Sequence, residues 1–430
     1  MLDQNNNIVA IDNNAEHLKV LAGKFWNQGV GCRPLEYDAF FSEPLSGVRI
    51  CFFDINLDDV ADVDAHKSKV FTTLASAIKA YISLENGPYA LIFWTDKGNV
   101  VEEFKAFVSE RYKDDFPIPY WVSFIDKDEF IGSDEGLWQK LQDVFSDKTI
   151  SFLFDFESRT RNAVAETVNQ LYEALPLNTW ESPDEFRLAF DKSLSSIAVK
   201  ALGFSHAKAN PERGVLEGLS PVISHYILTG ESEHTTWVQA LETLRTATRI
   251  ADVSFPDKSI QRKLNSTFHI DNAVTSAAAR GAVIQLDKEQ FNLIHEQPYE
   301  AWFSDLVPIS HAPTRRQSRN RSTLVAIEVS ASCDYSNDKK RTPKYLLGVI
   351  IPPVDISRDD SNRQPDNSAE LGVFHFDGNE IHIWVNLNFV INSLPEELSP
   401  ELKFGLKKEI MDYVGNRYAN HVSRIGITSF

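Results

Sequence analysis

Short, largely apolar runs recur through the first third of this 430-residue chain, and each is followed closely by a polar residue. Ile8–Ile11 is followed by Asp12, and Ile50–Phe53 is followed by Asp54. Runs of four or five apolar residues between polar ones are typical of strands that are buried on both faces of a sheet. Ligands of open α/β sheets bind beyond the carboxyl ends of such strands. We therefore expect Asp12 and Asp54 to meet at one edge of one sheet.

The same pattern continues farther along the chain, with helical segments between the apolar runs. Ala90–Trp94 and Tyr120–Ile125 are the next two runs. Residues 15–26 and 100–111 carry apolar side chains at helical spacing. Strands that alternate with helices are typical of a parallel sheet with helices packed on it. The sequence therefore predicts a doubly wound α/β domain.

The polar residues at the ends of these runs resemble the site of receiver domains, the response-regulator modules of two-component signalling. In that family an aspartate after the third strand accepts a phosphoryl group from a histidine kinase, and Asp54 stands there. Thr95 and Lys127 match the hydroxyl and lysine positions after the fourth and fifth strands, and Phe124 matches the aromatic switch position. The resemblance covers roughly residues 5–147 and implies a flavodoxin-like sheet of five parallel strands.

The resemblance also implies a magnesium site next to the phospho-acceptor. Mg²⁺ would be held by the side-chain oxygens of Asp12, Asn13 and Asp54 and by the backbone carbonyl of Asn56. A divalent cation removes much of the repulsion between a carboxylate nucleophile and a phosphoryl group, and it stabilises the charge that develops. Lys127 would add a second cation, and Thr95 could donate a hydrogen bond to the acyl phosphate.

Two departures from the family pattern leave the chemistry open. Asn13 stands where a second carboxylate is usual, and fewer charged ligands weaken a site for a divalent ion. Asp128 follows Lys127 at a position where a cis-proline is common. Two alternatives therefore remain beside a competent phospho-acceptor. One is a degenerate receiver that acts only as an adaptor, and the other is an unrelated α/β domain.

Charge and composition narrow the classes of partner and compartment. The net charge is −18, and residues 1–147 contribute much of it, with 25 acidic and 13 basic side chains. Such a surface repels a phosphate backbone, which disfavours nucleic-acid binding by this region. The sequence contains no apolar stretch long enough for a membrane helix and no signal-peptide pattern at its start. Three scattered cysteines, Cys32, Cys51 and Cys333, favour a reducing cytoplasm over a disulfide or zinc framework.

The remainder of the chain is predicted to form two further domains. Residues 148–309 have the pattern of a helical domain, with helices expected at 162–174, from Pro183 (capped by Ser182) to Leu202, and at 214–228, 235–250 and 258–267. Residues 310–430 are predicted to be β-rich, with strands at 323–329 and 345–351, a hairpin around Asp377-Gly378 and a final helix from Pro400 to His421.

The function expected from this organisation is signalling through protein contacts. A basic segment that contains Arg315, Arg316, Arg319 and Arg321 precedes the strands of the β-rich region, and we expect it to be a solvated linker. The expected partners are a histidine kinase or other phosphodonor and an unknown output protein, with no nucleic acid and no membrane. Receivers with output of this kind resemble those of bacterial anti-phage and conflict systems. An effector that binds or cleaves nucleic acid under receiver control is the alternative.

Overall fold

The structure is a computed structural model that describes residues 7–112, 115–131, 135–175, 183–230, 234–255, 257–289, 291, 297–330, 342–353, 366–398 and 401–423. Contacts within the chain divide it into two compact units. The first consists of Met1–Glu166 with His225–Thr246, and the second of Thr167–Ser224 with Ala247–Phe430.

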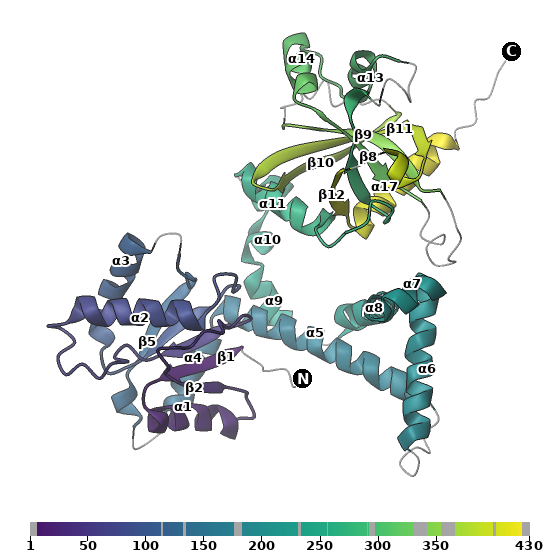
Figure 1. The fold of residues 1–430 in the computed structure, drawn as a ribbon. Helices are drawn as coiled ribbons and strands as arrows, with labels where there is room; N and C mark the ends of the chain where they lie inside the picture. Colours follow the sequence, from purple (N-terminus) through teal and green to yellow (C-terminus); the bar gives the residue numbers. More distant parts are fainter. Residues whose placement is uncertain are drawn as a thin grey trace. The chain divides into compact units, whose positions relative to one another are not determined.

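The first unit is built on a five-stranded sheet in which every pairing is parallel (Figure 1). Its strand order is β2-β1-β3-β4-β5. The bounds are Ile8–Asp12 for β1, Arg33–Glu36 for β2, Ile50–Phe53 for β3, Ala90–Trp94 for β4 and Trp121–Ile125 for β5. This order is that of flavodoxin-like doubly wound folds, so the predicted fold class is confirmed.

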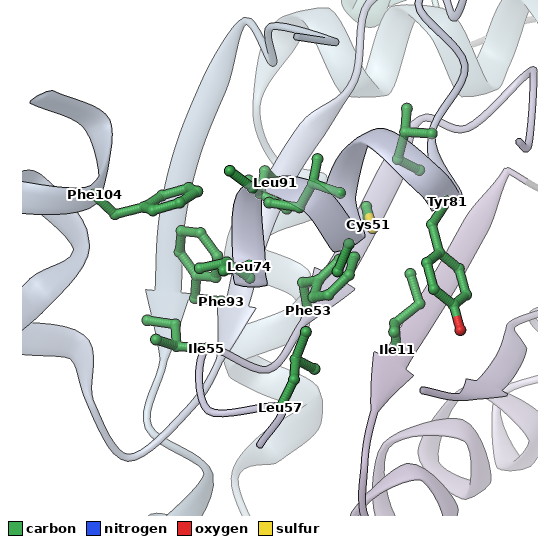
Figure 2. Packing of buried hydrophobic residues seen from close by; sticks show 14 of the residues in the cluster. Ile11, Cys51, Phe53, Ile55, Leu57, Leu74, Tyr81, Leu91, Phe93 and Phe104 are labelled. Carbon is green, nitrogen blue, oxygen red and sulfur yellow. The ribbon is translucent and has the colours of Figure 1, made fainter. Parts of the chain in front are cut away.

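Helices cover both faces of this sheet because successive strand residues point to opposite sides. Ile11, Phe53 and Phe93 belong to a core cluster with α2 (Lys67–Tyr81) and α3 (Val101–Arg111), and Figure 2 shows these side chains converging. Their strand neighbours pack in a second cluster, against α1 (Ala15–Asn27), α4 (Leu137–Phe145) and the first turn of α5 (Lys148–Glu173). Two apolar layers therefore hold the strand ends in place.

The middle of the chain is helical, as predicted. After α5 come α6 (Pro183–Leu202), α7 (Phe204–Ala209), α8 (Pro211–Thr229), α9 (His234–Ala240) and α10 (Glu242–Thr246). Gly203, at φ +79°, ends α6 as expected, whereas the predicted cap Ser182 lies outside the described residues. A single helix over 235–250 was wrong, because the segment is divided into α9, α10 and a 3₁₀ turn, η3 (Ile250–Val253).

The second unit contains a seven-stranded antiparallel sheet in the order β10-β11-β9-β8-β7-β12-β6 (Figure 1). The bounds are Ile270–Asp271 for β6, Ala282–Gln285 for β7, Thr323–Glu328 for β8, Lys344–Ile351 for β9, Ser368–Phe376 for β10, Asn379–Asn392 for β11 and Glu401–Leu406 for β12. Asp377 and Gly378 both have positive φ and form the predicted two-residue hairpin turn. The expected boundary between residues 309 and 310 falls inside this unit.

Helices flank this sheet in the second unit. They are α11 (Lys258–His269), α13 (Tyr299–Leu306), α14 (Ala312–Asn320) and α17 (Lys408–Val422). The predicted helix from Pro400 was wrong in its first turns, because residues 401–406 form β12 and pair with β7. Apolar residues four apart, such as Leu402 and Leu406, fit the period of a strand as well as that of a helix.

The basic segment is not a linker, which corrects the expectation for its arginines. Arg315 and Arg319 lie on α14, inside the second unit. The Arg315 guanidinium donates to the Ile309 carbonyl at 3.1 Å, and Arg319 pairs with Glu300 of α13 at 2.5 Å. These two side chains therefore stabilise local packing.

Two further expectations concern the cysteines and the membrane. Cys32 and Cys51 are free thiols, and Cys333 lies outside the described residues. In the part of the chain that the structure describes, every helix is too short or too polar to cross a bilayer.

Gly281 provides a test of the packing in the second unit. Its φ is +85°, and a methyl group there would lie 2.5 Å from the Leu406 carbonyl oxygen. Gly281→Ala is expected to destabilise this unit by roughly 3 kcal/mol, since it adds a backbone clash to left-handed strain. Hydrogen exchange of the β7 and β12 amides would measure this.

Gly378→Ala is the matched control, because Gly378 has φ +71° with open space around it. It should cost about 1 kcal/mol from the left-handed conformation alone. Equal acceleration of exchange in the two variants would contradict the assigned clash.

Candidate functional site

Four polar side chains named from the sequence come together at the carboxyl edge of the five-stranded sheet. Asp12, Asp54, Thr95 and Lys127 are 0%, 1%, 0% and 7% exposed. Backbone bonds between neighbouring strand ends hold them in place: the Asp54 N–H donates to the Ile11 carbonyl at 2.9 Å, and the Lys127 N–H donates to the Thr95 carbonyl at 3.4 Å. These residues are buried and do not lie on an exposed strand end.

Asp12 is held by the start of helix α1. Its Oδ1 accepts the Asn14 N–H at 2.8 Å, and the Asn14 side chain in turn caps α1 by accepting the Glu16 N–H at 2.9 Å. The other carboxyl oxygen, Oδ2, is buried and accepts no hydrogen bond. Two side-chain nitrogens lie near this oxygen, His17 Nδ1 at 3.5 Å and Lys127 Nζ at 3.6 Å. Asp12 Oδ2 is therefore a buried acceptor that is still available to a ligand.

Asp54 lies between a cation and a second anion. Lys127 Nζ is 3.0 Å from Asp54 Oδ2, and Asp54 Oδ1 accepts the Ile55 N–H at 2.8 Å. Burial raises the pKa of Asp54 above its ordinary value, and the Asp12 charge raises it further, while Lys127 and the Ile55 N–H oppose the shift. The desolvation of the carboxylate is the largest of these effects. Asp54 therefore gains a proton more readily than an exposed aspartate does.

Thr95 directly follows β4, and Phe124 lies on β5, next to the same sheet edge. The Thr95 hydroxyl oxygen accepts the Lys97 N–H at 3.1 Å. Phe124 is 48% exposed, and its ring lies so close to Gly98 that a methyl group on Gly98 would overlap it. The predicted switch residue thus packs over the loop that follows Thr95 instead of in the sheet core.

Asn13 and Asn56 complete the set of predicted site residues. The Asn13 amide nitrogen donates to Asp59 Oδ1 at 2.8 Å and lies 3.5 Å from the Asn56 carbonyl oxygen. Sequence reasoning did not single out Asp59 or His17 as site residues. Their positions, five residues after Asp54 and in the first turn after β1, were the available signals.

Mg²⁺ fits this donor set. The oxygens of Asp12, Asp54 and the Asn56 carbonyl are the type of ligand that the ion prefers, and Asp12 Oδ2 is buried without a hydrogen-bond partner. Over the described ranges, no three Asp, Glu, His or Cys side chains are grouped as a metal site. Two carboxylates therefore supply the charge, and an ion held by so few of them would keep several waters.

The sequence matches no protein-family model and no curated protein. The five-stranded parallel sheet is compatible with a flavodoxin-like or receiver-like fold. A fold of this kind hosts many activities, so the function has to be argued from the side chains at the sheet edge.

The raised pKa of Asp54 predicts how stability changes with pH. An acid whose pKa is higher in the folded state than in the unfolded state contributes stability at low pH, and this contribution is lost as pH rises through the folded pKa. The free energy of unfolding of the wild type, relative to Asp54→Asn, should therefore fall as pH rises. Denaturation with a chelator present, between about pH 4 and pH 8, would measure it.

Asp58→Asn is the control, because Asp58 is an exposed aspartate in the following loop. The Asp58→Asn protein should follow the wild type across the same range. A difference between wild type and Asp54→Asn that stays constant with pH would refute the assigned shift.

Proposed function

We propose that the N-terminal region is a receiver domain that accepts a phosphoryl group on Asp54 from a histidine kinase or another phosphodonor. The chain would then signal through contacts with an output protein. The observation that supports this most directly is the Lys127 ammonium, 3.0 Å from the buried Asp54 carboxylate. Asp12 and Thr95 lie at the same sheet edge, so nucleophile, cation, metal ligand and hydroxyl are present together.

Each side chain has a defined task in this chemistry. Asp54 attacks phosphorus, and the bond between phosphorus and the donor breaks. Mg²⁺, held by Asp12, Asp54 and the Asn56 carbonyl, would reduce the repulsion between the carboxylate and the phosphoryl group. Lys127 can bond to the phosphoryl oxygens as a second cation. The Thr95 oxygen already accepts a bond from Lys97, and its proton can be donated to the acyl phosphate.

A degenerate receiver that acts only as an adaptor is the second candidate, and one observation favours it. The Asn13 amide nitrogen, not its oxygen, faces the Asn56 carbonyl. The N–H₂ group of Asn13 thus occupies the Asn56 carbonyl oxygen, which Mg²⁺ would need as a ligand. Nucleic-acid binding by this region stays disfavoured, because its charge is strongly negative.

Beryllofluoride binding tests the proposal, because this ion mimics an acyl phosphate on a carboxylate. With Mg²⁺ present, the full-length chain should bind beryllofluoride, and acetyl phosphate should add one phosphoryl group to the intact mass. Asp54→Asn should abolish both, since its amide is no nucleophile. Lys127→Met should weaken beryllofluoride binding by roughly tenfold or more, because a charge-assisted bond is lost.

Asp58→Asn serves as the matched control, since it removes one acidic charge from the same region without touching Asp54. It should leave both signals intact. Modification that persists in Asp54→Asn would rule out the assigned acceptor. An absence of any response in the wild type would favour the adaptor.

A further inference from the structure

Trp237 of α9 connects two parts of the first unit that are far apart in the sequence. Its ring lies edge-on against Phe152 and Phe156 of α5, with centroid distances of 4.8 Å and 6.3 Å and interplanar angles of 78° and 72°. Aromatic pairs favour this edge-to-face arrangement. The indole N–H donates to the Asp155 carboxylate, so the polar end of the side chain also has a partner. One side chain thus makes apolar and polar contacts with α5 at the same time.

Arg159, one turn farther along α5, also contacts this part of the chain. Its guanidinium lies 6.0 Å from the centre of the Trp237 ring, at the outer limit of a cation–π contact. It donates to the Ile227 and Leu228 carbonyls, to the latter at 3.1 Å. Both carbonyls belong to the last turn of α8, where a cationic side chain is favoured. Arg159 therefore contacts both the end of α8 and the α9 tryptophan.

The chain crosses between the two compact units three times. It leaves the first unit after Glu166, returns at His225 and leaves again after Thr246. The contacts of Trp237 and Arg159 hold this returning segment, residues 225–246, on α5. If they open, everything after Glu166 remains attached to the five-stranded sheet through α5 alone.

The contact between α9 and α5 has the features of a reversible one. Trp237 is only partly buried, and Phe156 remains 44% exposed. Thr236 and Asp155 border a hollow of about 510 Å³ beside the contact, so the packing there is incomplete. α9 has seven residues, which is too short for a helix that is stable without docking. Polar, incompletely packed contacts are typical of parts of a chain that move relative to each other.

The helix that receives Trp237 is firmly attached to the sheet. Ile150, in the first turn of α5, is fully buried in the second apolar cluster. Asp147 caps the start of α5 by accepting the Thr149 and Ile150 N–H groups at 3.0 Å. Glu157, farther along α5, pairs with Arg49 at 2.7 Å. Opening of the contact would therefore move α9 and leave α5 in place.

We propose that α9 is a reversible latch, which closes on α5 through Trp237 and opens by local unfolding of residues 234–246. Closing holds the returning segment on the first unit and covers part of the Phe152 and Phe156 rings. Opening exposes these rings and Arg159, and aromatic and arginine side chains are enriched at protein interfaces. The inference goes beyond the proposed function, since it needs neither a metal nor a phosphoryl group.

Hydrogen exchange of the full-length chain, measured by mass spectrometry, tests the latch. In the wild type, the amides of residues 236–246 should exchange at least about 100-fold faster than those of β3 and β4, because local opening is enough to expose them. Trp237→Ala should accelerate their exchange by roughly tenfold more, because the docking side chain is lost. Exchange in β3 and β4 should stay the same, since their own packing is untouched.

Trp26→Ala is the matched control, because it removes the same type of side chain from α1 of the same unit. Trp26 is 83% exposed, so its loss should change the exchange of residues 236–246 less than about twofold. Trp237→Phe separates the two kinds of contact. It keeps a ring against Phe152 and Phe156 but loses the donor to Asp155, and its exchange should fall between wild type and Trp237→Ala.

Two results would reject the latch. Residues 236–246 that exchange as slowly as β3 and β4 in the wild type would make α9 a permanent part of the domain. Equal exchange in Trp237→Ala and Trp26→Ala would mean that Trp237 does not hold the segment. Neither result depends on whether Asp54 accepts a phosphoryl group.

Discussion

The site depends on an imbalance of buried charge: two carboxylates, Asp12 and Asp54, share one ammonium, that of Lys127. Removing ions from water costs several kcal/mol for each, and this cost is offset only where partners are well placed. Here the offset is incomplete, because Asp12 Oδ2 accepts no hydrogen bond. The excess charge can be neutralised by a proton or by a cation. The raised pKa of Asp54 reflects the first route, and the proposed Mg²⁺ is the second.

These two routes compete for the same carboxylate. A proton on Asp54 removes a metal ligand and the nucleophile together, so acid should suppress both cation binding and phosphate acceptance. Mg²⁺ should in turn lower the pKa of Asp54, since a cation favours the ionised form. A site with a second carboxylate at position 13 would bind the cation more strongly. With Asn13 there, a proton would compete more effectively with the proposed Mg²⁺ for the Asp54 carboxylate.

Four of the five strands of the first sheet could be predicted, because each is a largely apolar run that is followed by a polar residue. The edge strand β2, Arg33–Glu36, has no such run and was not predicted. The spacing of apolar residues gave a wrong prediction where it fitted both a helix and a strand. Leu402 and Leu406 satisfy a strand and a helix equally, and long-range pairing with β7 decides between them. The arginines of α14 were misplaced for a similar reason, since their partners, Glu300 and the Ile309 carbonyl, are set by tertiary packing.

The same division applies to the candidate site. Asp12 and Asp54 could be placed together because the ends of parallel strands meet at one edge, and the resemblance to receiver domains added Thr95 and Lys127. The partner of Asn13 could not, because it depends on a turn closed by the Asn56 side chain and on a left-handed Asp59. No spacing rule encodes that geometry. The exposed position of Phe124 likewise depends on its ring packing over Gly98.

The loop between Thr95 and Gly98 offers a short physical route from Asp54 to the surface. Thr95 accepts the Lys97 N–H, and Gly98 lies directly against the ring of Phe124. A phosphoryl group on Asp54 would accept a hydrogen bond from the Thr95 hydroxyl and attract this side chain. The Thr95 oxygen can keep the Lys97 N–H as its donor, so a shift of Thr95 would also move Lys97. Any resulting movement of the loop reaches Gly98 within three residues. Such a movement would change the contact between Gly98 and the Phe124 ring, whose present position is possible only because Gly98 has no side chain. A local change in charge would thus alter an exposed aromatic surface without a rearrangement of the sheet.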